Sequence, residues 1–293
     1  MKDPILRSGS ASFDFTNTAK PVITQNSKKA IIDWRQFSVD QNSEVSFVQP
    51  NTSSITLNRV VGGNPSIIHG SIHSNGQVWL LNNSGILIGK SGKINSHGFL
   101  ATTQYITNEN FLNGKYNFES TNNNSSNIVN NGSIFVQHGY AVLSGRRIEN
   151  TGVINATLGQ IVLGSAKTYT IDIVGDRLLS FAVREPFNLN DDISQINSSG
   201  ELNAVGGSIL LTAKVAKEQL KYGNIIRSFA ARAGVGFGTE SVTEVGQELA
   251  QYLASTVGSD KEFDSVELHE RLINAFVAGG TLGSAFSVPG TAY

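Results

Sequence analysis

The sequence of 293 residues contains no cysteine, so no disulfide can stabilise its fold. Charged residues are also sparse, at 15% of the chain, and they nearly cancel to a formal net charge of −1. No basic stripe of the kind that binds phosphate backbones is present, which argues against nucleic acid as a partner. No apolar run approaches the roughly eighteen residues of a membrane-spanning helix, so no transmembrane helix is expected.

The absence of cysteine is informative because a composition rich in Asn, Ser and Thr is typical of an extracellular surface. A disulfide loop formed too early would obstruct a chain exported unfolded through a narrow pore, and its absence permits that route. Met1 to Ser10 contains no apolar segment typical of a signal peptide. The sequence alone therefore leaves two expectations open, a truncated start or a protein that stays inside the cell.

A repeat is the most informative feature that is present. The segment beginning at Gly132 recurs 20 residues later at Gly152, and a third copy begins at Gly200. Each copy shares an apolar residue two positions after its first glycine, a second glycine seven positions after it, and then three apolar residues (Ile134, Ile154 and Leu202; Gly139, Gly159 and Gly207; 141–143, 161–163 and 209–211). Self-similarity at this period indicates a stacked repeat.

The two short apolar runs in each copy favour strands of about three to five residues joined by tight turns. One coil cannot bury its own apolar face, but coils stacked about 4.8 Å apart pair their backbones and align their inward Ile, Val and Leu side chains. We therefore predict a mainly β protein with a single-stranded parallel β-helix, in which Ile134, Ile154 and Leu202 share one core. Looser copies between Asn75 and Ala101 indicate that the helix starts well before residue 75.

Two segments are predicted to lie outside the stack. The β-rich runs 169–174 and 177–183, joined by Gly175-Asp176, are typical of a hairpin that covers a flank of the helix, with partner binding as the alternative. The segment 19–48 is expected to form an amino-terminal cap that closes the first coil. Trp34 and Phe37 are then cap core residues, although stacking of a ligand on Trp34 is a second interpretation.

The carboxyl-terminal part of the sequence has a different pattern. Residues 213–222 have a helical pattern that stops at Gly223, and two capping boxes precede apolar runs further on (Ser241 with Glu244; Asp264 with Glu267). We predict two parts, a β-helix domain at 1–224 and a largely α-helical tail at 225–293.

Five blocks of residues between 30 and 111 carry a resemblance to a known family. They are Ile32-Asp33-Trp34-Arg35-Gln36-Phe37, Phe47-Val48-Gln49-Pro50, Asn58-Arg59-Val60, the run from Asn75-Gly76-Gln77-Val78 to Asn82-Asn83-Ser84-Gly85, and Asn108-Glu109-Asn110-Phe111. In this order they resemble the amino-terminal secretion domain, or haemagglutination activity domain, of filamentous haemagglutinin and its relatives. These relatives are the exoproteins of two-partner secretion in Gram-negative bacteria. The resemblance covers about residues 10 to 215.

The resemblance implies a right-handed parallel β-helix with an amino-terminal cap and extra-helical β elements. It also implies recognition of the unfolded chain in the periplasm by an outer-membrane transporter barrel with periplasmic receptor domains, followed by folding outside. The protein would then be a secreted or surface-exposed adhesin, a monomer whose further partners are host-cell glycans or proteins. An amino-terminal fragment of a contact-dependent toxin is an alternative.

The positions that the resemblance nominates for secretion competence form two groups. One is the Asn-Arg-Val block, Asn58, Arg59 and Val60, and the other is the turn formed by Asn82, Asn83, Ser84 and Gly85. In the turn Asn83-Ser84 replaces the Pro-Asn of the family. Because proline fixes φ and stiffens a turn, this corner is expected to be looser.

A carbohydrate-active β-helix enzyme is the runner-up, and it would require carboxylates. No Asp or Glu occurs between Glu44 and Glu109 or between Glu119 and Glu149. The acids Asp191 and Asp192 belong to a charged loop, and His69 and His73, four residues apart, do not lie in a helical pattern (Gly70 separates them). We therefore expect no catalytic residue, no metal and no cofactor. The enzyme interpretation would require a cleft that gathers Asp172, Asp191 and Asp192.

Overall fold

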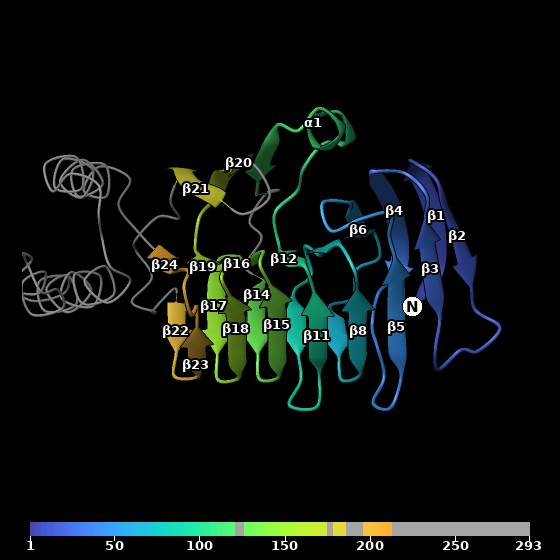
Figure 1. Cartoon of the computed structure of the whole chain (residues 1–293), viewed down its shortest axis with the longest axis horizontal. Coiled ribbons are helices and arrows are strands. Elements are labelled where there is room, and N and C mark those ends of the chain that lie inside the picture. The colour runs from blue at the N-terminus through green and yellow to red at the C-terminus, as the bar shows by residue number, and fades with distance from the viewer. Residues whose placement is uncertain (121–125, 175–177, 186–195, 213–293) are drawn as a thin grey trace, which may run out of the picture. The chain divides into compact units, whose positions relative to one another are not determined.

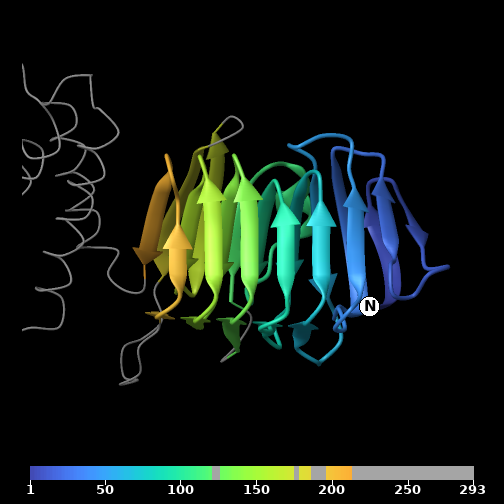
Figure 2. The ribbon, with the colours of Figure 1, turned by 60° about the horizontal axis from the view of Figure 1, so that its bottom comes forward.

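The computed structural model describes residues 1–120, 126–174, 178–185 and 196–212 of the chain. In these residues the backbone winds into a parallel β-helix whose coils stack along one axis (Figures 1 and 2). A complete coil contributes one strand to each of three sheets, and parallel pairing links each strand to its equivalent in the next coil. The predicted parallel β-helix is therefore confirmed.

The three sheets differ in length. The first sheet has the order β1 (Lys2–Ser8), β4 (Lys29–Gln36), β6 (Ile55–Val60), β9 (Gln77–Leu81), β12 (Gly98–Thr102), β16 (Tyr140–Ser144), β19 (Gln160–Gly164) and β24 (Ser208–Thr212). The second has the order β2 (Ala11–Asp14), β3 (Val22–Gln25), β5 (Glu44–Val48), β8 (Ser71–Ser74), β11 (Lys93–Ser96), β15 (Ser133–Gln137), β18 (Val153–Thr157) and β23 (Glu201–Asn203). The third is shorter, with β22 (Ile196–Ser198), β17 (Arg147–Asn150), β14 (Asn127–Asn130), β10 (Ile86–Ile88) and β7 (Ser66–Ile68).

The repeat aligns as the sequence predicts. Ile134 pairs with Ile154, which pairs with Leu202, and all three contribute to one apolar core inside the helix. At a neighbouring corner the Asn130 amide donates to Asn150 Oδ1 at 2.7 Å, and Asn150 donates to Ser198 Oγ at 3.1 Å. A 20-residue period thus places equivalent side chains directly above one another, so that both apolar and amide side chains form columns.

A glycine is required where one coil approaches the next at a corner. A β-carbon on Gly139 would overlap the carbonyl oxygen of His97, and one on Gly159 would overlap that of Gly139. Neither glycine has a positive φ, so the requirement is steric. The recurring glycine of the repeat therefore sets the distance between coils.

A second apolar core lies on the outer surface of the first sheet. In the apolar run of each copy, Ala141 and Leu143 point into the helix while Val142 points outward, and Val162 does the same one coil later. The sequence analysis predicted the column of inward side chains but not this second, outer core that contains Val142 and Val162. A strand alternates its faces, and here both faces are buried.

The outer core is covered by segments that leave the helix. These are α1 (Asn108–Leu112) and an antiparallel sheet of β13 (Tyr116–Glu119), β20 (Thr168–Val174) and β21 (Leu178–Glu185) (Figure 1). Tyr169 and Leu179 pack in this core, and Tyr169 stacks on Phe118 with ring centroids 4.7 Å apart. The predicted hairpin and its covering role are confirmed, while its expected turn at Gly175-Asp176 lies outside the described residues.

The amino-terminal cap differs from the prediction. The segment 19–48 was expected to be the cap, but β3, β4 and β5 within it already pair in parallel as the first coils. The cap is formed upstream, where β1 pairs antiparallel with β4 and β2 pairs antiparallel with β3. The sequence of residues 1–14 gave little indication of these strands, because polar residues separate most of its apolar ones.

Trp34 is buried at the junction of the cap and the first coil, as is Phe37. Phe13 and Phe15 approach the Trp34 ring edge-on at 6.0 and 6.5 Å. The interpretation of both aromatics as packing residues is confirmed. The predicted helices at 213–222 and beyond residue 225, and with them the domain boundary at 224, lie outside the described residues.

Three buried tyrosines predict how the fold responds to alkaline pH. Burial raises the pKa of Tyr116 from 10.0 to about 12, and burial raises the pKa of Tyr140 and of Tyr169 further. Above pH 10 the unfolded chain loses phenolic protons that the folded chain keeps, so stability is complete below pH 10 and falls as pH rises towards 12. We expect tyrosinate absorbance from these residues to appear together with loss of the β-sheet circular dichroism, and ionisation of all tyrosines near pH 10 in a folded protein would contradict this.

Candidate functional site

The two groups of nominated residues meet at one surface cavity of about 440 Å³. The residues that line it come from β4, from the end of β6, from the end of β9 and from the segment after β12 (Asp33, Arg59, Val60, Val61, Gly62, Leu81, Asn82, Asn83, Gln104 and Tyr105). Strand pairing explains the meeting, because Arg59 in β6 lies beside Leu81 in β9 and the turn begins at the next residue, Asn82. One coil of the helix separates the two motifs in sequence and brings them side by side in space.

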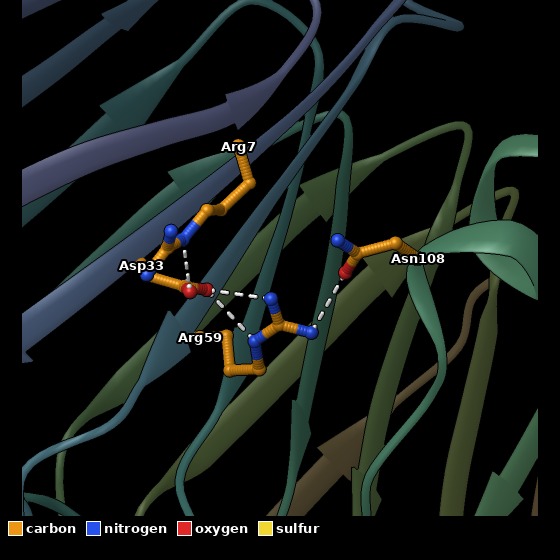
Figure 3. Close-up of polar contacts among 4 residues, drawn as sticks. All are labelled: Arg7, Asp33, Arg59 and Asn108. Carbon is orange, nitrogen blue, oxygen red and sulfur yellow. Dashed lines mark hydrogen bonds and ion pairs between the residues drawn. The ribbon is translucent and has the colours of Figure 1, made fainter.

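Asp33 lies at the centre of an ion-pair network at this cavity (Figure 3). Its Oδ1 accepts from Arg59 Nε at 2.8 Å and lies 2.7 Å from the second nitrogen of that guanidinium, while its Oδ2 accepts from Arg7 Nε at 2.7 Å. The Asp33 side chain is 6% exposed, that of Arg59 12% and that of Arg7 46%. Asp33 and Arg59 are direct neighbours in register on β4 and β6, so the backbone pairing itself aligns the charges.

Arg59 also reaches the segment that covers the outer core. Its remaining terminal nitrogen donates to Asn108 Oδ1 at 2.9 Å (Figure 3). Its guanidinium carbon lies 5.5 Å from the centre of the Tyr105 ring. Asn108 is the first residue of α1, whose preceding residue Thr107 caps the helix by accepting from the Asn110 N–H. The Asn-Arg-Val block is thereby tied to the Asn-Glu-x-Phe block 50 residues away in sequence.

The other end of α1 is held by a second cation from the first sheet. Lys29 Nζ in β4 donates to the carbonyl oxygens of Phe111 at 2.7 Å and Leu112 at 3.1 Å, and it lies over the rings of Phe111 and Tyr116. Partial burial, more than the neighbouring Lys28, lowers the pKa of Lys29. Phe111 in turn contacts Trp79 of β9 with ring centroids 5.5 Å apart. Two cations therefore fasten the short helix across the outer core.

Asn58 points into the helix and is fully buried. Its Oδ1 accepts from Trp34 Nε1 at 3.0 Å, and its Nδ2 donates to the carbonyl oxygens of Thr56 and Trp79 at 3.3 Å. Val60, two residues on, is also buried in the inner core. Asn58 and Val60 therefore pack between neighbouring coils inside the helix. Within the block, only Arg59 places its polar atoms at the cavity.

The turn after β9 is closed by hydrogen bonds of the buried Asn82. Asn82 Oδ1 accepts from the Ser84 N–H at 2.9 Å, the Gly85 N–H donates to the Asn82 carbonyl at 3.0 Å, and the Asn82 amide donates to Asn64 O and Ser66 Oγ. Gly85 has φ of +106°, which a side chain would strain. The looser corner expected from the missing proline is thus held by an Asx turn, and Asn83 is the exposed member of the group.

Sequence reasoning nominated Arg59 but none of the side chains that contact it or share its carboxylate partner: Asp33, Arg7, Tyr105 and Asn108. Asp33 carried a usable signal, since an acid inside the apolar run 30–34 must find a cationic partner if that strand is buried. Arg7 and Tyr105 carried none, because they belong to a cap strand and an excursion that the repeat does not predict.

The polar residues of the site connect segments of the fold to one another. The Arg59 nitrogens are occupied by Asp33 and Asn108, and within the described ranges no three His, Cys, Asp or Glu side chains cluster as a metal site would require. Asp172 is exposed on β20, and Asp191 and Asp192 lie outside the described residues. In the same part of the chain, no helix combines the length and apolarity needed to cross a membrane.

Comparison with known proteins gives consistent matches over most of the chain. The family model described as the TPS secretion domain matches residues 7–248. The heme/hemopexin-binding protein of Haemophilus influenzae is 33% identical over 209 residues, which cover 69% of this chain and 22% of that protein. A second Haemophilus influenzae protein with the same name is 44% identical over 96 residues, 33% of this chain and 10% of that protein. The chain spans about a fifth or less of the length of these relatives.

A solved structure is similar as well. The crystal structure of the HMW1 secretion domain from Haemophilus influenzae superposes with a TM-score of 0.64 at 34% sequence identity, covering 72% of this chain and 57% of that chain.

Proposed function

This chain belongs to the TPS secretion domain family, and from that membership we propose that it directs the protein that carries it through an outer-membrane transporter to the cell surface or the medium. The match to the family over residues 7–248 is the observation that carries the proposal. The family is a secretion domain of adhesin-like exoproteins and is not a known enzyme family. We assign export to this segment, and not the binding for which the relatives are named, because the family match describes a secretion domain.

We propose that the transporter engages the chain while it is unfolded in the periplasm. Asn58 is fully buried in the folded domain, and Val60 and Asn82 expose only a small part of their surface to the cavity. In an unfolded chain the same residues are exposed. After export, when the chain folds, they form the contacts between neighbouring coils. Stacking buries apolar surface at roughly 25 cal/mol per Å², so each coil that folds outside opposes backward sliding.

The proposed whole protein is an adhesin whose downstream part acts at the cell surface, with host glycans or proteins as partners and a monomeric secretion domain. The division at residue 224 and the helical tail at 225–293 belong to this proposal. A carbohydrate-active enzyme would need Asp191 and Asp192, which lie outside the described residues. That alternative and the toxin fragment are therefore supported by sequence alone.

Secretion in a reconstituted system tests the proposal directly. The chain, preceded by a periplasmic signal peptide, is co-expressed with an outer-membrane transporter of the two-partner type from the same bacterium, and the culture medium and periplasm are assayed. We expect the chain in the medium only when the transporter is present. Equal amounts in the medium without the transporter would reject transporter-dependent export, and detection only in the cytoplasm and periplasm in both cases would do the same.

Substitution of Asn58 separates recognition from folding. Asn58→Ala leaves the Trp34 N–H buried without its acceptor, so we expect a loss of about 1–3 kcal/mol in the free energy of unfolding, together with reduced secretion. Asn95→Ala is the matched control, since Asn95 is an exposed asparagine on β11 of the same helix. Urea denaturation of the purified domains gives the stability, and blocked secretion of an Asn58→Ala variant with unchanged stability would indicate direct recognition instead.

A further inference from the structure

The sequence contains three Asn-Gly steps, at 75–76, 113–114 and 131–132, and the fold treats them very differently. Asn-Gly is the dipeptide in which an asparagine side chain is most open to attack by the following backbone nitrogen, because glycine has no side chain to crowd that nitrogen. The three steps share this dipeptide, and the large differences between them lie in their tertiary contacts.

Two of the steps are locked into corners of the helix. The Asn75 amide exchanges two hydrogen bonds of 2.7 Å with the backbone of Gln49, and Gly76 N–H donates to Ser74 Oγ. Asn131 Oδ1 accepts from Thr151 Oγ1 at 2.7 Å. Both glycines are buried: the β-carbon position of Gly76 faces the Gln49 side chain and the Asn51 carbonyl oxygen, and that of Gly132 faces the carbonyl oxygens of Gly89 and Gly92. Rotation of either asparagine towards its glycine nitrogen would break these side-chain hydrogen bonds to a neighbouring coil.

The third step is open. Asn113 and Gly114 are both exposed at the end of α1, and within the described part of the chain the Asn113 side chain has no hydrogen-bond partner. The neighbouring atom nearest to the β-carbon position of Gly114 is Lys29 Nζ, at 3.8 Å. Gly114 N–H donates to the Phe111 carbonyl at 3.2 Å, the long end of the range for such a bond, and φ of Gly114 is +74°.

We propose that Asn113 is a site of spontaneous deamidation in the folded domain, while Asn75 and Asn131 are protected. The Gly114 backbone nitrogen attacks Asn113 Cγ, a nitrogen–carbon bond forms, and the side-chain nitrogen leaves as ammonia with the proton from the attacking N–H. Water then opens the resulting succinimide at either carbonyl and yields aspartate or isoaspartate at position 113. No oxidant or reductant is involved. The attack requires the Gly114 N–H to leave the Phe111 carbonyl, which opens the last turn of a five-residue helix.

The product places a new carboxylate at the residue that follows the two carbonyl groups bound by Lys29. Lys29 Nζ already donates to Phe111 O and Leu112 O, so a carboxylate at 113 adds a negative charge at the same end of α1. Isoaspartate also lengthens the main chain between α1 and β13 by one atom. The reaction therefore alters the link that holds the covering segment, and it changes the net charge by one unit.

Peptide mapping by mass spectrometry tests the proposal on the intact chain. The folded protein and a urea-unfolded sample are incubated in mildly alkaline buffer, and the mass gain of amide-to-acid conversion is followed at each asparagine. In the folded sample we expect Asn113 to convert at least about tenfold faster than Asn75 or Asn131, since about 1.4 kcal/mol of opening free energy is sufficient for that ratio. In urea the three rates should converge.

The matched variant is Asn113→Gln, whose longer side chain would form a six-membered ring and cyclises far more slowly. It should abolish conversion at position 113 and leave the denaturation midpoint unchanged, because the side chain is exposed. Equal conversion at the three sites in the folded protein, or faster conversion at 75 or 131, would overturn the proposal. So would a rate at Asn113 that is negligible in the folded protein and rises only in urea.

Discussion

Replacing Asp33 by alanine is expected to lower the free energy of unfolding by about 3–5 kcal/mol, because it removes one partner of a mostly buried ion pair and leaves the other without compensation. Arg59 remains 12% exposed, held in place by Asn108 and beside the Tyr105 ring. Arg7, at 46% exposed, can turn to water. The cost therefore arises at Arg59, and urea denaturation followed by tryptophan fluorescence measures it.

The exposed ion pair on the covering sheet provides the control. Lys167 and Glu185 are 2.7 Å apart with side chains 48% and 52% exposed, so Glu185→Ala should change stability by less than about 1 kcal/mol. Equal effects of the two substitutions would show that the Asp33 network is no more than a surface contact. The double variant Asp33→Ala with Arg59→Met should recover part of the loss, since it removes the uncompensated charge.

The second large effect is expected from a single methyl group at a corner of the helix. Gly139→Ala places a β-carbon inside the van der Waals radius of the His97 carbonyl oxygen, which belongs to the backbone of the neighbouring coil and cannot rotate away. The coils must separate locally, and we expect a loss of about 2–4 kcal/mol, at or above the usual range for overpacking. The thermal midpoint and the urea midpoint should both fall.

Gly63→Ala is the matched control, because no atom lies within 4 Å of its β-carbon position. At a compatible site the exchange restricts the unfolded chain, so stability should stay the same or rise by up to about 1 kcal/mol. If Gly139→Ala were as harmless as Gly63→Ala, the coil spacing would not be set by the corner glycines.

The repeat determined the fold class from sequence alone. A period of 20 residues with apolar positions in register admits few solutions, and the alignment of Ile134 with Ile154 and Leu202 follows from it directly. The hairpin at 168–185 was also predictable, since two β-rich runs on either side of Gly-Asp pair with each other without help from distant residues. Both predictions depend on local pattern, which a single sequence contains in full.

The site could be predicted only in part. The resemblance nominated Arg59 and Asn82, and their adjacency at one cavity follows from the coil length. Asp33, Arg7 and Asn108 join Arg59 from three other segments, and no spacing in the sequence links them. The cap was placed too far along the chain for the same reason, since antiparallel pairing of β1 with β4 leaves no repeat to detect.

The sequence by itself determined the stack of coils, because residues one period apart in a repeat become neighbours in adjacent coils. What only the tertiary structure decided is the outer surface of that stack: which side of each strand receives a cover, and which of three identical Asn-Gly steps remains open. Those outcomes depend on contacts between segments that share no period, such as Lys29 with the end of α1. Such contacts are determined by packing in three dimensions, and the sequence separation of the two residues does not predict them.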